Sequence, residues 1–229
     1  MGPLLKKGCA KLSNCFTFYN ICIMKKITHI IFDFGAVIIN IDYDTTIQAF
    51  KNLGIKNAEK LYSKKIQNKL FEQLEEGKIS NQNFIDEIKS ISDYATNDEI
   101  VEAWNMMLGN IPEKRIRLLE SLSKNYKLIL LSNTNSIHIE RIIRDFGEKK
   151  WNSFKKLFYK FYLSHELGMR KPNEEIFVKV LSDNSIEAEN ALFIDDSPQH
   201  INAARKLKIN CHHLKKSEEI TDLFPGIIQ

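Results

Sequence analysis

The sequence lacks the features of several classes of protein. It holds four cysteines in 229 residues, and no two of them form a Cys-x-x-Cys pair, so neither a disulfide framework nor a zinc site of that kind is indicated. No stretch approaches the ~20 continuous apolar residues of a membrane-spanning helix. The net charge is only +4 and the lysines are scattered, which argues against binding of nucleic acid. A cytoplasmic protein without membrane or nucleic-acid partners is therefore expected.

The composition is that of a folded protein. Hydrophobic residues make up 43% of the chain and charged residues 27%, the balance of an ordinary globular domain. A chain of this length suits one α/β domain with an insertion, or two small domains. We find no internal repeat and no low-complexity tract, and we expect a monomer or a homodimer.

Residues 1–23 differ in pattern from the rest of the chain. Two lysines precede apolar residues there, as in a secretory signal, but polar residues interrupt every apolar run and no small-residue cleavage site follows. Met24 stands almost directly before the first predicted strand. We therefore predict that residues 1–23 are an N-terminal extension outside the fold, with a short peripheral anchor as the alternative.

Short apolar runs alternate with helical patterns in much of the chain. Each run has the length and character of a buried parallel strand. The runs are "ITHIIF" (27–32), "YKLILL" (126–131) and "ALFI" (191–194), with "LFYKFYLS" (157–164) as a fourth. Helical patterns cover residues 136–147, 173–184 and 197–209. This alternation predicts an α/β fold with a Rossmann-like, doubly wound parallel sheet.

The region from residue 43 to 119 has a different pattern. It contains several helical patterns separated by glycines, and Ser80 is a suitable N-cap for one of them. No strand pattern lies between these helices. We therefore predict an all-helical cap over residues 43–119, inserted into a core that consists of residues 24–42 and 120–229.

Polar residues stand at the ends of the predicted strands. They are Asp33, Ser132, Asp195 and Asp196, with Lys171 shortly after a further strand. Singly, each could be an ordinary turn, cap or solvent-exposed residue. In an open α/β sheet, however, ligands bind beyond the carboxyl ends of the strands. Three carboxylates at that edge would repel one another unless a divalent cation lay between them, and Mg²⁺ prefers such oxygen ligands.

Four motifs resemble a known family. In chain order, "FDFGAV", "LSNTN", "GMRKP" and "FIDDS" resemble the motifs of the haloacid dehalogenase superfamily, over residues 27 to about 212. The runs "YLSHELGMRKPNEEIF" and "FEQLEEGKIS" resemble its bacterial branch of glucose-1-phosphate-type sugar phosphatases. The resemblance implies a Rossmann-like core with a small helical cap. It also implies an Mg²⁺-dependent phosphatase for a small phosphorylated metabolite, with a sugar phosphate as the leading expectation.

The resemblance also implies roles for individual residues. Asp33 would be the nucleophile that attacks phosphorus and forms an aspartyl-phosphate, which divides one difficult step into two easier ones. Ser132 would donate a hydrogen bond to a phosphate oxygen, and Lys171 would balance the charge of both Asp33 and the phosphate. Asn133 would stand beside the phosphate, where backbone N–H groups at the start of the next helix add donors.

A metal site is implied by the same resemblance. Asp33, Asp195, Asp196 and the backbone carbonyl of Gly35 would surround Mg²⁺, and the ion would polarise the phosphoryl oxygens. Gly35 and Ala36 are small, which permits phosphate and metal to approach this backbone closely.

Gly35 stands where most phosphatases of the superfamily carry a second Asp, which acts as general acid and base. Such help is typically worth about 10²–10⁴-fold in rate. One interpretation is an enzyme whose substrate has a better leaving group, such as an anomeric sugar phosphate or an acyl phosphate, with water, Asp42 or Glu72 supplying the proton. The other is a catalytically weak relative that binds phosphate or metal, or has a regulatory role.

Other classes with similar residues fit less well. A receiver domain also uses an acid pair, a phosphorylated Asp, Ser or Thr, Lys and Mg²⁺, but its acid pair comes first in the chain, and here it comes last. A 2-haloacid dehalogenase needs no metal, whereas Asp195 and Asp196 favour a metal site. The missing acid at Gly35 argues against a phosphomutase, which must activate a sugar hydroxyl.

Three further expectations concern the surroundings of the site. His200 is close in sequence to the acid pair and is expected at the rim of the site. Trp104, Met106 and Met107 are expected to pack within the cap, with Trp104 facing the substrate as the alternative. Opening and closing of the cap would control the access of water.

Overall fold

A five-stranded parallel sheet forms the centre of the molecule. The computed structural model describes residues 26–61 and 69–225, so the predicted extension of residues 1–23 lies outside the described residues. The strands are β1 (His29–Phe32), β2 (Lys127–Ser132), β3 (Lys160–Leu163), β4 (Ala191–Asp195) and β5 (Asn210–His213). They lie in the order β3-β2-β1-β4-β5, and every neighbouring pair is parallel. The predicted parallel α/β sheet is therefore confirmed.

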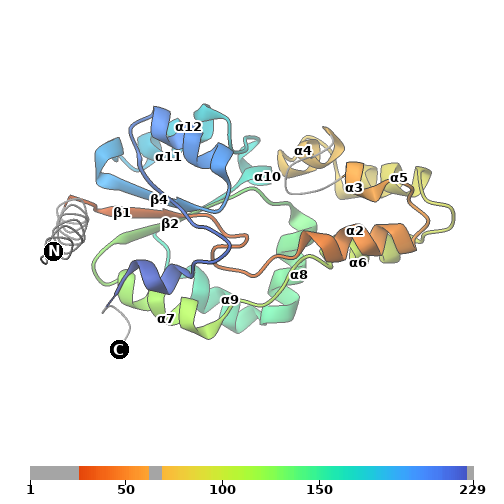
Figure 1. Cartoon of the computed structure of the whole chain (residues 1–229), viewed down its shortest axis with the longest axis horizontal. Helices are drawn as coiled ribbons and strands as arrows, with labels where there is room; N and C mark the ends of the chain where they lie inside the picture. Colours follow the sequence, from red (N-terminus) through yellow and green to blue (C-terminus); the bar gives the residue numbers. More distant parts are fainter. Residues whose placement is uncertain (1–25, 62–68, 226–229) are drawn as a thin grey trace, which may run out of the picture.

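Helices cover both faces of this sheet (Figure 1). In the core they are α7 (Glu113–Leu122), α8 (Ser136–Phe146), α9 (Glu148–Lys155), α10 (Ser164–Leu167), α11 (Glu174–Asp183) and α12 (Pro198–Lys206), with 3₁₀ turns η1 (Ala188–Asn190) and η2 (Ile220–Leu223). Alternate strand residues point to opposite faces. Ile30 and Phe32 therefore pack with α7, α8 and α9, whereas Ile31 packs with α11 and α12.

Local signals set the limits of the core helices. The side chain of Asn135 caps α8 by accepting a hydrogen bond from the backbone N–H of His138 at 3.0 Å. Gly147 ends that helix with φ at 87°, a conformation that glycine adopts without strain. Pro198 occupies the first turn of α12, where its missing N–H costs nothing. Both helices agree with the predicted patterns, as does α11.

The described residues of the cap form five helices. They are α2 (Tyr43–Asn52), α3 (Ala58–Leu61), α4 (Lys69–Glu75), α5 (Asn81–Ser90) and α6 (Asn97–Asn105). Their shared interior is aromatic, since the rings of Phe50, Phe71 and Phe84 lie 6.3, 5.0 and 5.6 Å from that of Trp104. Ser80 caps α5 as predicted, by accepting from Asn83 at 3.1 Å. Of the methionines expected in the cap, Met107 is buried and Met106 is half exposed.

The cap ends before the predicted boundary at residue 119. That residue lies within α7, whose Leu118, Leu119 and Leu122 are fully buried in the same cluster as the strand residues of β1. Helix α7 therefore belongs to the core, and its glycine-free amphipathic pattern does not reveal the change of partner.

Two paired chain segments join the cap to the core. Ile41 and Leu108 form an antiparallel bridge, and Gly109 donates a backbone hydrogen bond to Asn40 at 2.8 Å. Any side chain at Gly109 would come within 2.9 Å of the Cβ of Asn40. The two connections therefore behave as one short ribbon rather than as two separate linkers.

Further contacts seat the cap on the core. Ile137 of α8 is buried in the aromatic cluster of the cap, and Ser136 donates to Asn81 at 2.8 Å. A side chain at Gly77 would collide with the backbone carbonyl of His165 in α10. This structure therefore has the cap closed on the core.

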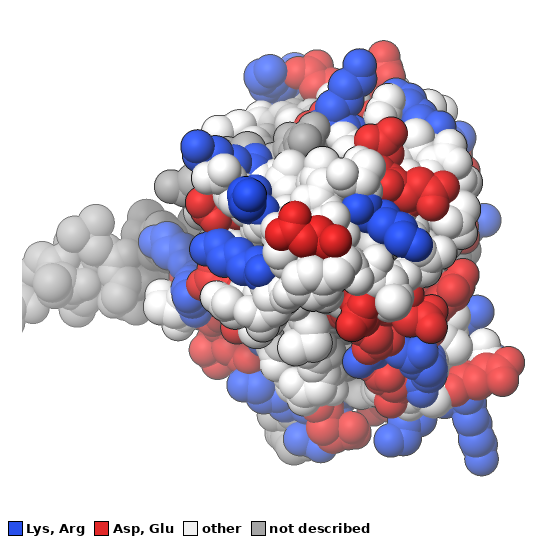
Figure 2. Space-filling model, turned by 90° about the vertical axis from the view of Figure 1, so that its right-hand side faces the viewer, with Lys and Arg blue, Asp and Glu red and all other residues white. Residues whose placement is uncertain are grey.

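Charges on the cap end of the molecule are mixed rather than segregated. Figure 2 shows Lys and Arg interspersed with Asp and Glu over this face. Such a surface offers no extended basic track for a phosphate backbone. Within residues 26–61 and 69–225, no helix is long and apolar enough to cross a membrane.

Candidate active site

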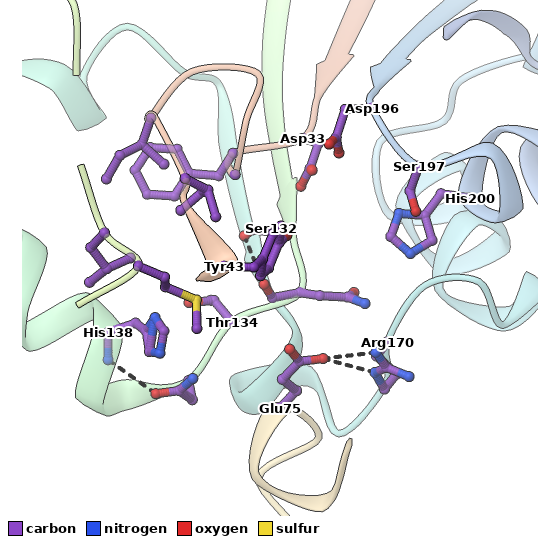
Figure 3. A pocket seen from close by; sticks show the side chains of 18 of the residues that line it. Asp33, Tyr43, Glu75, Ser132, Thr134, His138, Arg170, Asp196, Ser197 and His200 are labelled. Atoms are coloured by element: carbon purple, nitrogen blue, oxygen red, sulfur yellow. Dashed lines mark hydrogen bonds and ion pairs between the residues drawn. The ribbon is translucent and has the colours of Figure 1, made fainter. Parts of the chain in front are cut away.

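A cavity of about 370 Å³ lies between the carboxyl edge of the sheet and the cap (Figure 3). The core contributes the predicted residues at the ends of β1, β2 and β4, and the cap contributes residues of α2, α4 and α6. The lining includes Asp33, Gly35, Tyr43, Glu72, Glu75, Trp104, Ser132, Asn133, Arg170, Asp196 and His200. The structure thus brings the predicted strand-end residues to one place.

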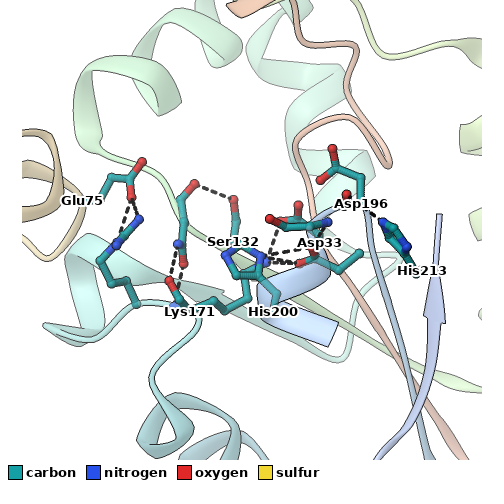
Figure 4. A network of polar contacts seen from close by, with 11 residues as sticks. Asp33, Glu75, Ser132, Lys171, Asp196, His200 and His213 are labelled. Carbon is teal, nitrogen blue, oxygen red and sulfur yellow. Dashed lines mark hydrogen bonds and ion pairs between the residues drawn. The ribbon is translucent and has the colours of Figure 1, made fainter. Parts of the chain in front are cut away.

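Lys171 is the centre of the polar network (Figure 4). Its side chain is fully buried, and its ammonium group donates to Asp33 Oδ1 at 2.8 Å and to Asp195 Oδ2 at 2.7 Å. Burial disfavours the charge of Lys171, but the two carboxylates outweigh that effect and raise its pKa. The lysine therefore stays protonated between two acids.

Asp33 and Asp195 respond differently to this shared lysine. Burial raises the pKa of Asp33 to about 7; Lys171 opposes this rise, and the charges of Asp195 and Asp196 add to it. Burial also disfavours the charge of Asp195, but Lys171 and His200 outweigh it and hold its pKa below the usual range. One lysine does not balance three carboxylates, so burial and the neighbouring charges raise the pKa of Asp33 while that of Asp195 is lowered.

Asp195 is fully occupied by protein donors. Its Oδ1 accepts from the backbone N–H of Ser197 at 2.7 Å and lies 3.0 Å from Nδ1 of His200, while Oδ2 accepts from Lys171. His200 lines the cavity beside the acid pair, where it was predicted. Burial lowers the pKa of His200, so a neutral ring donating through Nδ1 fits this contact.

Asn133 fixes the position of the lysine. Its side-chain amide donates to the backbone carbonyl of Lys171 at 2.8 Å and accepts from the backbone N–H of Lys171 at 2.9 Å. Because Asn133 directly follows Ser132 at the end of β2, the strand end and the lysine loop are held in register. The side chain of Asn133 thus serves the lysine loop, which the sequence does not indicate.

The acid cluster fits a divalent cation. One oxygen from each of Asp33, Asp195 and Asp196 lies within 4.8 Å of the others. Hard carboxylate oxygens are the ligands that Mg²⁺ prefers. The negative charge left over by Lys171 is the second observation in favour of a cation.

Gly35 has room for a side chain. A Cβ at this position would meet only Ile41, at 3.4 Å from Cγ1 and 4.0 Å from Cδ1, which is ordinary contact. The neighbouring Ala36 has φ at 58°, so the positive φ of this turn falls on Ala36. A Cβ atom at this position is therefore not sterically excluded.

The two predicted proton donors differ in position. Asp42 is exposed, and its side chain accepts from the backbone N–H of Asp44 at 3.1 Å as the N-cap of α2. It is absent from the described lining of the cavity, so the structure gives no support to Asp42 as the acid. Glu72 does line the cavity.

Sequence reasoning missed the residues at the other end of the cavity. Arg170 donates to Glu75 Oε2 through Nε at 3.0 Å, and its Nη1 donates to Glu72 at 3.1 Å. Tyr43 also lines this space. The only sequence signal was that Arg170 directly precedes Lys171, and spacing alone could not reveal partners 95 and 98 residues away.

Comparisons with known proteins agree with this geometry. A sequence model described as haloacid dehalogenase-like hydrolase matches residues 30–213. The D-ribitol-5-phosphate phosphatase of Bacteroides thetaiotaomicron is 32% identical over 182 residues, which are 79% of this chain and 88% of that protein.

Solved structures give the same result. A HAD family enzyme of Bacteroides thetaiotaomicron, in complex with magnesium and inorganic phosphate, has a TM-score of 0.79 and 33% identity, over 86% of this chain and 98% of that one. A predicted HAD-like hydrolase of Porphyromonas gingivalis has a TM-score of 0.76 and 31% identity, over 87% and 98%.

Proposed function

Because the chain belongs to the haloacid dehalogenase-like hydrolase family, we propose that it is a phosphatase that requires Mg²⁺ and acts on a small phosphorylated metabolite. The observation that carries the proposal is the pairing of one buried lysine, Lys171, with Asp33 and Asp195 beside Asp196. Such an arrangement supplies both a nucleophile and a cation site at one sheet edge.

Asp33 is the proposed nucleophile. A carboxylate oxygen of Asp33 attacks phosphorus, a phosphorus–oxygen bond forms, and the bond to the leaving oxygen breaks. Water then attacks the aspartyl-phosphate, which releases inorganic phosphate and restores the carboxylate. Ser132, 2% exposed at the end of β2, donates to a phosphate oxygen, and Lys171 balances charge on Asp33 throughout.

Asp33, Asp196 and the backbone carbonyl of Gly35 would hold Mg²⁺ directly. Asp195 would add negative charge close to the ion, since protein donors already occupy both of its oxygens. Bound Mg²⁺ supplies charge screening between Asp33 and the phosphate dianion and polarises the phosphoryl group. The related wild-type enzyme, solved in complex with magnesium and inorganic phosphate, supports Mg²⁺ as the ion.

The substrate is proposed to be a phosphorylated sugar or sugar alcohol. A cavity of about 370 Å³ is at the small end of ligand pockets, which suits a small metabolite. The related phosphatase acts on D-ribitol 5-phosphate, an ester of a primary alcohol rather than an anomeric phosphate. That relative favours an ordinary alcohol as the leaving group, so the leaving oxygen needs a proton. Glu72 and water are the remaining proposed sources.

The test is phosphate release from p-nitrophenyl phosphate and a panel of sugar and sugar-alcohol phosphates, with Mg²⁺ and with EDTA. Asp33→Asn should lower kcat at least ~10³-fold, as expected for loss of a nucleophile. Asp183→Asn is the matched control, because Asp183 forms an exposed pair with Lys179. No release by the wild type in Mg²⁺ would instead support a catalytically weak binding protein, and full activity of Asp33→Asn would exclude Asp33 as nucleophile.

A further inference from the structure

A buried ion pair lies across the cavity from Asp33 and Asp196 (Figure 3). Glu75, at the end of α4 in the cap, is 5% exposed, and the side chain of Arg170, from the core, is 12% exposed. Two nitrogens of Arg170 approach Oε2 of Glu75, at 3.0 and 2.9 Å. The pair thus fixes a carboxylate in the wall opposite Asp33 and Asp196.

The described residues of this wall carry more negative than positive charge. Arg170 is the sole Lys or Arg among the described residues that line the cavity, and it is already shared between Glu75 and Glu72. Among the described residues, two carboxylates therefore share one guanidinium. An anionic leaving group would find no uncommitted positive partner in this described lining, and burial makes such a mismatch costly.

Part of the remaining wall is apolar and aromatic. This part includes Ile39, Ile41, Trp104, Met107, Leu108 and Ile142, with the neutral ring of His138 edge-on to Trp104 at 4.5 Å, while Thr134, Asn135, Ser197 and Gln199 add polar groups elsewhere in the lining. Tyr43 lines the cavity as well, and burial together with the charges of Asp196, Asp33 and Glu75 raises its pKa, so its hydroxyl stays protonated. A sugar or polyol has the matching character, with C–H groups on one side and hydroxyls on another.

We propose that Glu75, held in place by Arg170, is the specificity-determining residue of the leaving-group subsite. Its carboxylate accepts hydrogen bonds from hydroxyls of a neutral, polyhydroxylated leaving group, and its charge disfavours leaving groups that carry a carboxylate. This inference rests on the proposed phosphatase function and goes beyond it by assigning the residue and the charge that select the substrate.

Arg170 has a positioning part in this assignment. The guanidinium places a positive charge beside the carboxylate of Glu75 and fixes its orientation through two nitrogens that approach one oxygen. Selection by charge therefore depends on both residues.

The experiment compares two substrates that differ only at the end remote from the phosphate. These are D-ribitol 5-phosphate, which ends in a hydroxyl, and D-ribonate 5-phosphate, which ends in a carboxylate. p-Nitrophenyl phosphate reports on the phosphoryl end alone. The variants are Glu75→Gln and Glu75→Asp, with Glu76→Gln as the matched control, because Glu76 is the next residue, carries the same charge and is not part of the described cavity lining.

The wild type should prefer ribitol phosphate. Glu75→Gln should lower kcat/KM for ribitol phosphate about tenfold or more, the value of a hydrogen bond to a charged group. Glu75→Gln should also lower the ratio of kcat/KM for ribitol phosphate to that for ribonate phosphate. The kcat/KM for p-nitrophenyl phosphate should change less than about threefold. Glu75→Asp keeps the charge and should keep the discrimination against ribonate phosphate, which separates the proposal from a loss of folding in the Gln variant.

Two results would overturn the inference. One is an equal loss for p-nitrophenyl phosphate and ribitol phosphate in both Glu75 variants, which would assign Glu75 a structural role. The other is an unchanged ratio between ribitol and ribonate phosphates. A wild type that hydrolyses none of the three substrates would instead refute the proposed function, so the two failures are distinguishable.

Discussion

The two ends of the cavity depend on neighbouring residues of one chain segment. Lys171 is buried between Asp33 and Asp195, all three from the core, whereas Arg170 reaches out to Glu72 and Glu75 in the cap. The side chains of the first set are at most 11% exposed, whereas Glu72 in the second keeps a side chain that is 44% exposed. The phosphoryl end is thus a fixed part of the core, while the leaving-group end exists only where cap and core meet.

Removal of the lysine should have the largest effect on stability. Lys171→Met leaves two buried carboxylates without their shared partner, and breaking a buried pair in this way costs about 3–5 kcal/mol. Urea unfolding in EDTA would measure the loss. The control is Lys179→Met, which breaks a half-exposed pair and should cost about 0.5 kcal/mol. Equal losses for the two variants would remove the distinction between the ends.

Magnesium should stabilise the phosphoryl end, and more strongly at high pH. The native pKa of Asp33, about 7, is above the ordinary 3.8, so its contribution to stability is full below 3.8 and is lost as pH rises through 7. Mg²⁺ bound to the ionised carboxylate offsets that loss, whereas at pH values below the pKa of Asp33 it must compete with the proton. Saturating Mg²⁺ at about 100 Kd should add about 2.7 kcal/mol, visible as a larger rise in Tm at pH 8 than at pH 5.5. A rise that is larger at pH 5.5 would contradict this account.

Loss of the arginine should have a smaller effect on stability than loss of the lysine. Arg170→Met removes the guanidinium that contacts the buried Glu75 but allows Glu72 to turn to solvent, so we expect a loss of about 1–3 kcal/mol, the range for a lost hydrogen bond to a buried polar group. Urea unfolding measures this as well. The deficit should be the same with and without Mg²⁺, because the pair lies at the other end of the cavity. A deficit that Mg²⁺ repairs would show that the two ends are coupled.

A restored acid should give a smaller gain at the phosphoryl end. In Gly35→Asp the Cβ of the new side chain meets only Ile41, at ordinary contact distance. We expect kcat for ribitol phosphate to rise about tenfold. This is less than the usual contribution of a general acid, because the introduced carboxyl group would be imperfectly placed. p-Nitrophenyl phosphate, whose leaving group needs no proton, should change little. Gly35→Ala is the control for the added bulk, and an equal effect of both substitutions would exclude acid catalysis.

The same contrast decides what the sequence could predict. Asp33, Ser132 and the acid pair follow strands that are contiguous apolar runs, so the parallel sheet alone places them together. Glu75 and Arg170 meet only because α4 packs near α10, a contact with no periodic signal. Local pattern therefore reveals the phosphoryl end, and tertiary packing creates the rest.

Two elements of the core are not among the predicted apolar runs and helical patterns, for physical reasons. Strand β5 has the sequence "NCHH" and is half buried along its length at the edge of the sheet, so it lacks the apolar run of a central strand. Helix α9 is short and polar on most of its surface, with Trp151 and Phe154 as its buried contacts. Neither pattern stands out from a loop. Both elements need the rest of the sheet before their burial becomes favourable.

The insertion of Ile137 from core helix α8 into the aromatic interior of the cap has a consequence for cooperativity. A cap whose buried interior consisted only of cap residues could unfold and refold while the core stayed intact. Here the cap interior is completed by a residue of the core, and the ribbon of Ile41 and Leu108 ties the two further. Amide protons of α2 and α6 should therefore exchange in the same global event as those of α8, and the two lobes should lose their structure together.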